Sequence, residues 1–142
     1  MPDPSREKPP TLVELIWEHD LVFGGQSADV QLKLDSASAA GPSPIQALAF
    51  GLAGCMAMDV VYILRKGRVD LKGLKADLTG RRAPEVPHRF LAFALHFTVT
   101  GDVPGEQVQR AVDLSRDKYC SVWHSLRQDI ELAVTFKVTT AG

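Results

Sequence analysis

The alternation of apolar and polar positions predicts six β-strands. Five segments carry an apolar residue at every second position, which is typical of strands that bury one face. The strands are expected at residues 13–18, 21–23, 29–35, 74–79, 90–100 and 130–138. Val30, Leu32 and Leu34 are expected to point inward, and Gly24-Gly25 to reverse the chain, because glycine tolerates positive φ. Both faces of 90–100 are largely apolar, so this strand is predicted to be central in its sheet.

Residues 42–67 form the longest predicted helix, and their apolar side chains leave no polar face. A helix of this kind is expected to be buried on every side. Ser43 and Gln46 have the spacing of a capping box, and Gly67 is expected to end the helix. The uninterrupted apolar run covers only residues 47–58, whereas a membrane span needs roughly 20 residues. The sequence therefore favours a core helix over a transmembrane helix.

Two shorter helices are predicted in the second half of the chain. One begins at Pro104, and after a pause at 117–118 another runs from about residue 119 to 126. The order β-β-β-α-β-β-α-α-β predicts an α+β fold with mainly antiparallel sheets. One sheet covers only one side of the apolar helix, so we expect a second subunit to cover the other in a homodimer. Residues 11–142 are predicted to form a single domain after a flexible arm at 1–10.

Composition and charge narrow the range of partners. The 142 residues include 16 basic and 17 acidic side chains, so there is no basic excess of the kind that marks nucleic-acid binding or an anionic membrane surface. The first ten residues lack the apolar segment of a secretory signal, and a cytoplasmic location is expected. No phosphate-binding loop or dinucleotide motif is present, so no cofactor is predicted.

The two cysteines, Cys55 and Cys120, allow two interpretations. In the first, each is a small buried apolar residue, as free cysteine commonly is. In the second, folding brings the thiols together. Gly51 and Gly54 would let another element approach Cys55 closely, and the start of a predicted helix near Cys120 would favour a thiolate. A thiol oxidised by peroxide to a sulfenic acid can then condense with a second thiol to form a disulfide.

Other ionisable residues give weaker signals. His124 follows Cys120 by four positions, but a single pair of this kind does not define a metal site, and none is predicted. Asp59 is a charge within the apolar helix, four residues after Cys55. A carboxylate near a thiol raises the pKa of that thiol, so a structural role for Asp59 is favoured.

Seven short motifs resemble the OsmC/Ohr family, the osmotically inducible and organic hydroperoxide resistance proteins, and in particular its YhfA-like branch. The similarity extends from Trp17 to Val138. The motifs are Ser43-Pro44, Ala53-Gly54-Cys55, Asp59–Leu64, Lys66–Arg68, Thr98–Gly101, Arg110–Ser115 and Lys118–Val122.

The resemblance implies an intertwined homodimer in which antiparallel sheets wrap two long central helices. It also implies that Cys55 is a peroxidatic thiolate, that Cys120 is the resolving thiol, and that a dithiol reductant reopens their disulfide. The implied substrate is an organic hydroperoxide, and the implied role is oxidative stress defence. The family's activating glutamate and arginine are not evident. Ile45 and Gln46 occupy the glutamate positions, and Gln46 is the candidate supporting residue.

Two other functions on the same fold remain open at this point. The cysteine pair could serve a non-catalytic redox sensor, or the protein could bind an apolar small molecule. A structural dimer module is a third interpretation.

Overall fold

The computed structural model describes residues 6–140, which form two compact units divided between Leu48 and Ala49. The first half of the predicted N-terminal arm, residues 1–5, lies outside the described residues, and residues 6–10 are exposed. The long helix α1 crosses the boundary between the units. That residues 11–142 act as one domain stays a prediction.

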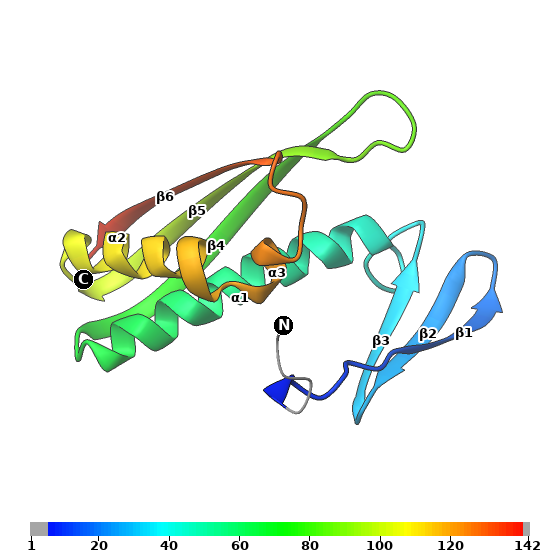
Figure 1. Cartoon of the computed structure of the whole chain (residues 1–142), viewed down its shortest axis with the longest axis horizontal. Coiled ribbons are helices and arrows are strands. Elements are labelled where there is room, and N and C mark those ends of the chain that lie inside the picture. The colour runs from blue at the N-terminus through cyan, green and yellow to red at the C-terminus, as the bar shows by residue number, and fades with distance from the viewer. Residues whose placement is uncertain (1–5, 141–142) are drawn as a thin grey trace. The chain divides into compact units, whose positions relative to one another are not determined.

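The first unit contains a three-stranded antiparallel sheet (Figure 1). Its strands, in spatial order, are β1 (Glu14–His19), β2 (Val22–Ser27) and β3 (Val30–Asp35). The predicted reversal at Gly24-Gly25 is wrong, since both glycines lie inside β2 and the turn follows at Ala28, where φ is 51°. A Cβ on Gly25 would lie 2.8 Å from the Leu32 carbonyl oxygen. Glycine is therefore required here for close packing between strands.

Apolar residues of this sheet are exposed within the chain. Val30 is 68% and Leu32 50% exposed, so their predicted inward orientation does not bury them in a core of this chain. The other large exposed apolar side chains of the first unit are Leu12, Val13, Leu15, Ile16, Trp17 and Leu21. The alternating pattern forms the predicted strands, but it leaves an apolar surface on the sheet.

Asp35 organises the loop that leads from β3 to the long helix. Its buried carboxylate accepts backbone N–H groups from Ala37 at 2.9 Å, Ala39 at 3.2 Å and Ala40 at 2.9 Å. These hydrogen bonds, with that of Ala40 the strongest, hold the pKa of Asp35 below its usual value. The small residues of this loop are thus fixed by one side chain.

The helix α1 (Pro44–Lys66) begins with the predicted capping box. Ser43 Oγ accepts the Gln46 backbone N–H at 3.3 Å, and Gln46 Oε1 accepts the Ser43 N–H at 2.9 Å. The helix ends where predicted, but the residue in the left-handed region is Arg68, with a φ of 60°.

Only one side of α1 is buried within the chain. The buried stripe repeats every fourth residue and comprises Leu52, Met56, Val60 and Leu64. Phe50, Met58 and Tyr62 on other sides are more than 60% exposed, so burial on every side is not achieved by a single chain. Among the described residues, α1 is the one helix long and apolar enough to cross a membrane. Core helices share these properties, and we interpret α1 as a core helix because its buried stripe packs within the second unit.

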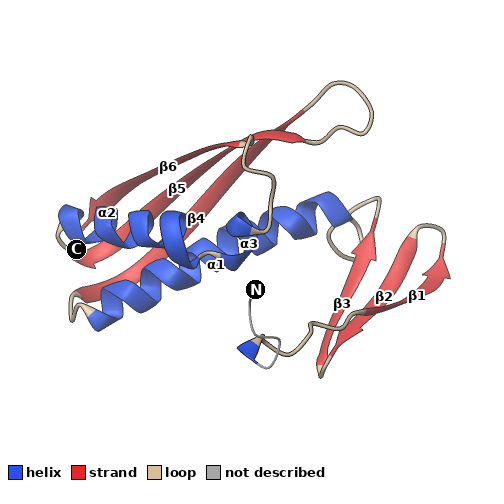
Figure 2. Cartoon of the chain, viewed as in Figure 1, coloured by secondary structure: helices blue, strands red, loops and turns tan. Residues whose placement is uncertain are grey.

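The second unit is built on the sheet β4 (Asp70–Arg82), β5 (Phe90–Asp102) and β6 (Glu131–Thr139). β4 and β5 form an antiparallel hairpin, and the predicted central place of β5 is confirmed. β6, however, pairs parallel to β5. This parallel pair was not predicted, because mainly antiparallel sheets were expected. The buried face of β5 carries Phe93, Leu95, Phe97 and Val99. Figure 2 shows the helices running along this sheet.

A helical crossover joins β5 to β6, as parallel pairing requires. It consists of α2 (Gly105–Leu114), the π-helical turn η2 (Ser115–Tyr119) and the short helix α3 (Ser121–His124). The π-turn corresponds to the predicted pause between the two helices. Because the π-turn contains one extra residue, the Cys120 backbone N–H donates a hydrogen bond of 2.8 Å to the Ser115 carbonyl oxygen.

Candidate functional site

The two cysteines lie close together within the second unit. Cys55 is on α1, and Cys120 is at the junction of η2 and α3. Cys55 Sγ, Cys120 Sγ and a carboxylate oxygen of Asp59 all lie within 4.8 Å of one another. Both thiols are free. The fold therefore brings together two sulfur atoms from segments far apart in the sequence, together with one carboxylate. We call these three residues the thiol–carboxylate cluster.

The position of Asp59 follows from helix geometry and from one hydrogen bond. Cys55 and Asp59 are four residues apart on α1, so their side chains lie on one face of the helix. Ser115 Oγ donates a hydrogen bond of 2.8 Å to Asp59 Oδ2. A carboxylate in an apolar helix needs such a partner, because burying it unpaired is costly. The structural role predicted for Asp59 agrees with this hydrogen bond.

Ser115 also positions the second cysteine. Its side chain is fully buried, and its carbonyl oxygen accepts the Cys120 N–H. A single residue thus contacts both Asp59 and Cys120. The sequence reasoning missed Ser115. The available signal was the charge at Asp59, which requires a polar partner from another segment.

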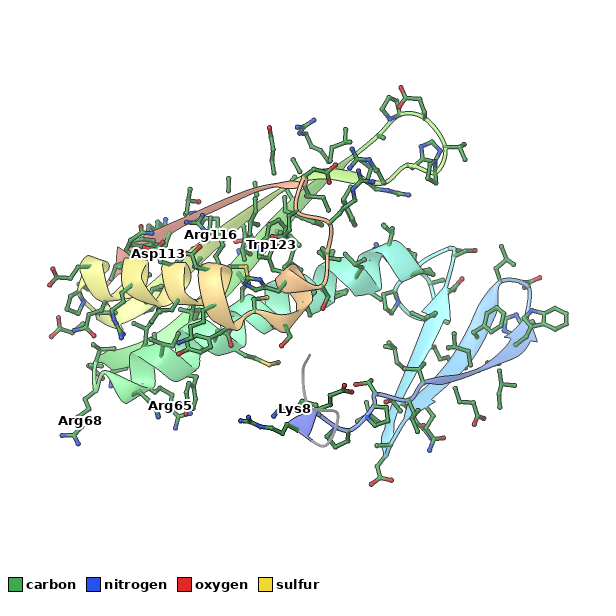
Figure 3. The ribbon with its side chains drawn as sticks, viewed as in Figure 1. Lys8, Arg65, Arg68, Asp113, Arg116 and Trp123 are labelled. Atoms are coloured by element: carbon green, nitrogen blue, oxygen red, sulfur yellow. The ribbon has the colours of Figure 1, made fainter. Side chains whose placement is uncertain are left out.

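Cys120 is buried, and its sulfur is hydrogen bonded. Cys120 Sγ accepts the backbone N–H of Trp123 at 3.3 Å and caps α3 (Trp123 is labelled in Figure 3). The pKa of the Cys120 thiol is raised to about 11, chiefly by burial and also by Cys55 and Asp59, and the Trp123 N–H partly offsets these effects. Cys120 does lie at a helix N-terminus as expected, but α3 has only four residues, and the Trp123 N–H does not outweigh burial. Cys120 is therefore a protonated thiol at neutral pH.

Arginine side chains do not neutralise the cluster in the described part of the chain. Arg116, next to Ser115, pairs with Asp113 at 3.4 Å and Asp117 at 3.6 Å (Figure 3 labels Arg116 and Asp113). Over residues 6–140, Asp59 forms no ion pair with a lysine or arginine. The charged group within the cluster itself is thus the Asp59 carboxylate.

Other residues singled out from the sequence lie elsewhere. Gln46 Oε1 accepts hydrogen bonds from Ser38 and Ser43 in the cap of α1, and a supporting role for Gln46 at the thiols stays a prediction. His124 is exposed, whereas Cys120 is buried. A Cβ on Gly51 or Gly54 would meet no described atom within 4 Å beyond its chain neighbours and the surrounding backbone of α1. The close approach expected at these glycines is thus not made within this chain.

An open depression of about 680 Å³ reaches the cluster at Asp59. Its walls are mainly aromatic and aliphatic, and two cationic side chains also line it. The lining residues are Asp59, Tyr62, Ile63, Lys66, Gly67, Arg110, Leu114 and Tyr119. A small molecule with an apolar body fits such a surface, since most binding sites combine apolar walls with a few polar groups.

Comparison with known proteins identifies the family. The family model described as OsmC-like protein matches residues 35–135. Protein YhfA of Escherichia coli K12 is 41% identical over 128 residues, covering 88% of this chain and 96% of YhfA. The chain therefore belongs to the OsmC-like protein family, as the sequence motifs indicated.

Solved structures share the fold at low sequence identity. A hypothetical protein from Aquifex aeolicus VF5 has a TM-score of 0.88 at 24% identity, covering 95% of this chain and all of that protein. An organic hydroperoxide resistance protein OsmC from Legionella pneumophila has a TM-score of 0.69 at 14% identity, and the match covers 94% of this chain and all of the Legionella chain. These likenesses confirm the OsmC-like α+β fold.

Proposed function

We propose that the protein is a thiol-dependent peroxidase-like protein that reduces organic hydroperoxides through Cys55 and Cys120 in oxidative stress defence. The observation that carries this proposal is the proximity of the two sulfur atoms to each other within the cluster. Membership of the OsmC-like family and the likeness to a hydroperoxide resistance protein support it. The cytoplasmic location expected from the sequence belongs to the same proposal.

The two cysteines take different roles. Cys55 is partly exposed and Cys120 is buried with a raised pKa, so Cys55 is the better candidate for the thiolate that meets the peroxide. The Cys55 thiolate attacks the outer peroxide oxygen, the O–O bond breaks, and the alkoxide takes a proton to leave as an alcohol. Cys55 is then a sulfenic acid.

Cys120 completes the cycle. Its sulfur attacks the Cys55 sulfur, a disulfide forms, and the sulfenic hydroxyl leaves as water with the Cys120 proton. A dithiol reductant then exchanges with this disulfide and restores both thiols. Since the sulfur atoms lie within 4.8 Å, they must approach by at most about 2.8 Å to reach the roughly 2 Å of a disulfide.

The depression beside Asp59 supports an organic substrate. Tyr62, Ile63, Leu114 and Tyr119 offer an apolar surface for the carbon chain of a hydroperoxide. Burying that chain contributes roughly 25 cal/mol per Å² of apolar area, a gain that hydrogen peroxide cannot make. We therefore propose organic hydroperoxides as the preferred substrates.

The proposed active form is a homodimer. The exposed apolar side chains Phe50, Met58 and Tyr62 of α1 form a surface that a single chain leaves in water. Gly51 and Gly54 add open backbone that a second helix could approach closely. Covering this face would bury the remaining sides of α1, as the fully apolar sequence of the helix predicts.

Peroxide consumption tests the proposed function. The purified protein should consume cumene hydroperoxide with a dithiol such as dihydrolipoamide, in buffer containing a metal chelator. Cys55→Ser should abolish turnover, and Ser121→Ala, an exposed neighbour of Cys120, should retain it. Full turnover by Cys55→Ser, or none by the wild-type protein, would overturn the proposal.

A redox sensor is the second candidate, and one observation favours it. The described chain places a carboxylate rather than an arginine beside the thiols, which disfavours a reactive thiolate. A sensor needs only slow, reversible disulfide formation. Negligible turnover together with a Cys55–Cys120 disulfide after one equivalent of hydroperoxide would select this candidate.

A further inference from the structure

The thiol–carboxylate cluster combines the donor types of a metal site. Cys55 and Cys120 supply two sulfur donors and Asp59 one oxygen donor, all within 4.8 Å of one another. We propose that the reduced thiol pair and Asp59 bind a thiophilic divalent cation, Zn²⁺ being the best match. Zinc takes mixed cysteine and carboxylate ligands, whereas magnesium and calcium prefer oxygen ligands alone.

The geometry fits with little adjustment. Zn–S bonds of about 2.3 Å in a tetrahedral site place two sulfur atoms about 3.8 Å apart. The three donor atoms already lie within 4.8 Å of one another. Small side-chain movements, without a change of rotamer, bring them to bonding distance. Three protein ligands leave a fourth position for water, the arrangement of a zinc site that can exchange ligands.

Neighbouring groups hold two of the ligands in place. Ser115 donates to Asp59 Oδ2, which leaves Oδ1 available for a cation. The Trp123 N–H fixes the sulfur of Cys120. Hydrogen bonds of this kind orient metal ligands and typically account for a 10- to 100-fold difference in affinity.

The electrostatic environment also suits a cation. Between residues 6 and 140, Asp59 has no lysine or arginine in an ion pair, so its carboxylate remains available to a cation, although Lys66 and Arg110 line the depression beside it. Burial and the neighbouring carboxylate disfavour a free thiolate, and a bound Zn²⁺ reverses that preference by displacing the two thiol protons. The same environment that slows thiol chemistry thus stabilises metal binding.

Metal binding and disulfide formation exclude each other. A Cys55–Cys120 disulfide removes both sulfur ligands, and Zn²⁺ is released. A bound Zn²⁺ occupies the sulfur lone pairs that would attack a peroxide. Binding itself does not depend on the proposed function, whereas inhibition of turnover by Zn²⁺ rests on it.

Zinc titration of the intact protein tests the inference. Reduced, metal-free protein should compete with a chromophoric chelator for one Zn²⁺ per chain, and diamide-oxidised protein should not. Cys55→Ser and Cys120→Ser should each weaken binding by at least ~100-fold, and Asp59→Asn by ~10-fold. Asp117→Asn, which removes a nearby carboxylate outside the cluster, should bind as the wild type does.

Cobalt provides a readout that does not depend on the variants folding. Co²⁺ bound to the reduced wild-type protein should show thiolate-to-cobalt charge-transfer absorption, lost on oxidation. Binding of less than half an ion per chain, absence of that band, or equal effects of Asp59→Asn and Asp117→Asn would each overturn the inference. Peroxidase turnover is measured with chelator present, so its failure leaves the zinc result unaffected.

Discussion

Ser115 donates a hydrogen bond of 2.8 Å to Asp59, and this bond joins the crossover of the second sheet to the core helix. Ser115 begins the π-turn that ends next to Cys120, whereas Asp59 lies one helical turn beyond Cys55. The bond therefore connects the two segments that carry the thiols. Its loss should affect both stability and the geometry of the thiol pair.

Ser115→Ala should lower the free energy of unfolding by about 1 to 2 kcal/mol, because it leaves the Asp59 carboxylate without its buried donor. Disulfide formation after one equivalent of hydroperoxide should also slow. Urea unfolding and quenched-flow thiol counting measure the two effects. Ser121→Ala, at an exposed position, is the matched control and should stay within about 0.5 kcal/mol of the wild type. Equal stability of the two variants would contradict the structural role of Ser115.

Alkylation should distinguish the two thiols. At neutral pH, iodoacetamide should modify Cys55 well before Cys120, because Cys120 is buried and its thiol pKa is about 11. Peptide mass spectrometry at several times measures the order. In urea both cysteines should react at similar rates, which controls for intrinsic reactivity. Faster modification of Cys120 in the folded protein would reverse the assigned roles.

Acid titration should reveal the contribution of Asp35. The pKa of its carboxyl is lowered in the folded chain by backbone N–H donors, so its stabilising effect is present above the unfolded-state pKa of about 3.9. The effect is lost as the pH falls through the folded-state pKa. Asp35→Asn should therefore be less stable at pH 7, and its difference from the wild type should shrink on acidification.

Chemical unfolding between pH 2 and 7 measures this difference. Asp29→Asn, in the exposed turn between β2 and β3, is the control and should follow the wild type across the range. A difference for Asp35→Asn that stays constant with pH would argue against carboxylate capping of the loop.

Oligomeric state should depend on the exposed side of α1. Met58→Glu places a charge on the apolar face and should shift the mass in solution from twice the 15.5 kDa chain mass toward a single chain. Light scattering after gel filtration measures this shift. Val86→Glu adds the same charge at another exposed apolar residue, in the β4–β5 turn, and should leave the dimer intact. A wild-type protein that elutes as a monomer would refute the dimer.

The regular elements could be predicted because local pattern determines them. Period-two segments became strands, and the apolar run with its Ser43–Gln46 box became α1. The parallel pairing of β6 could not be predicted from alternation, since an inward-facing residue has the same spacing beside a parallel or an antiparallel neighbour. Gly25 was predicted to lie in a turn but lies inside β2. A glycine can be required either for positive φ or for space between strands, and the sequence does not distinguish the two.

The candidate site was only partly accessible from sequence. Cys55 and Cys120 were singled out as a possible thiol pair and given roles through the family motifs, and their proximity depends on the folded crossover. The contact between Ser115 and Asp59 spans 56 positions, and a single serine carries no local signal for such a bond. The helix N-terminus expected at Cys120 is present, but burial outweighs its effect on the thiol pKa, and the depth of burial depends on the folded crossover.

The π-turn between α2 and α3 has a consequence for comparing relatives. A π-turn holds one residue more than an α-helical turn, and each residue of an α-helix advances the chain by about 100°. Deleting one residue between Ser115 and Tyr119 would convert the π-turn into an α-helical turn, in which the cysteine N–H still reaches the Ser115 carbonyl. The extra residue is thus absorbed within the turn, and the helix on either side keeps its direction. A homologue that keeps both cysteines and has a one-residue gap here would still hold them in register.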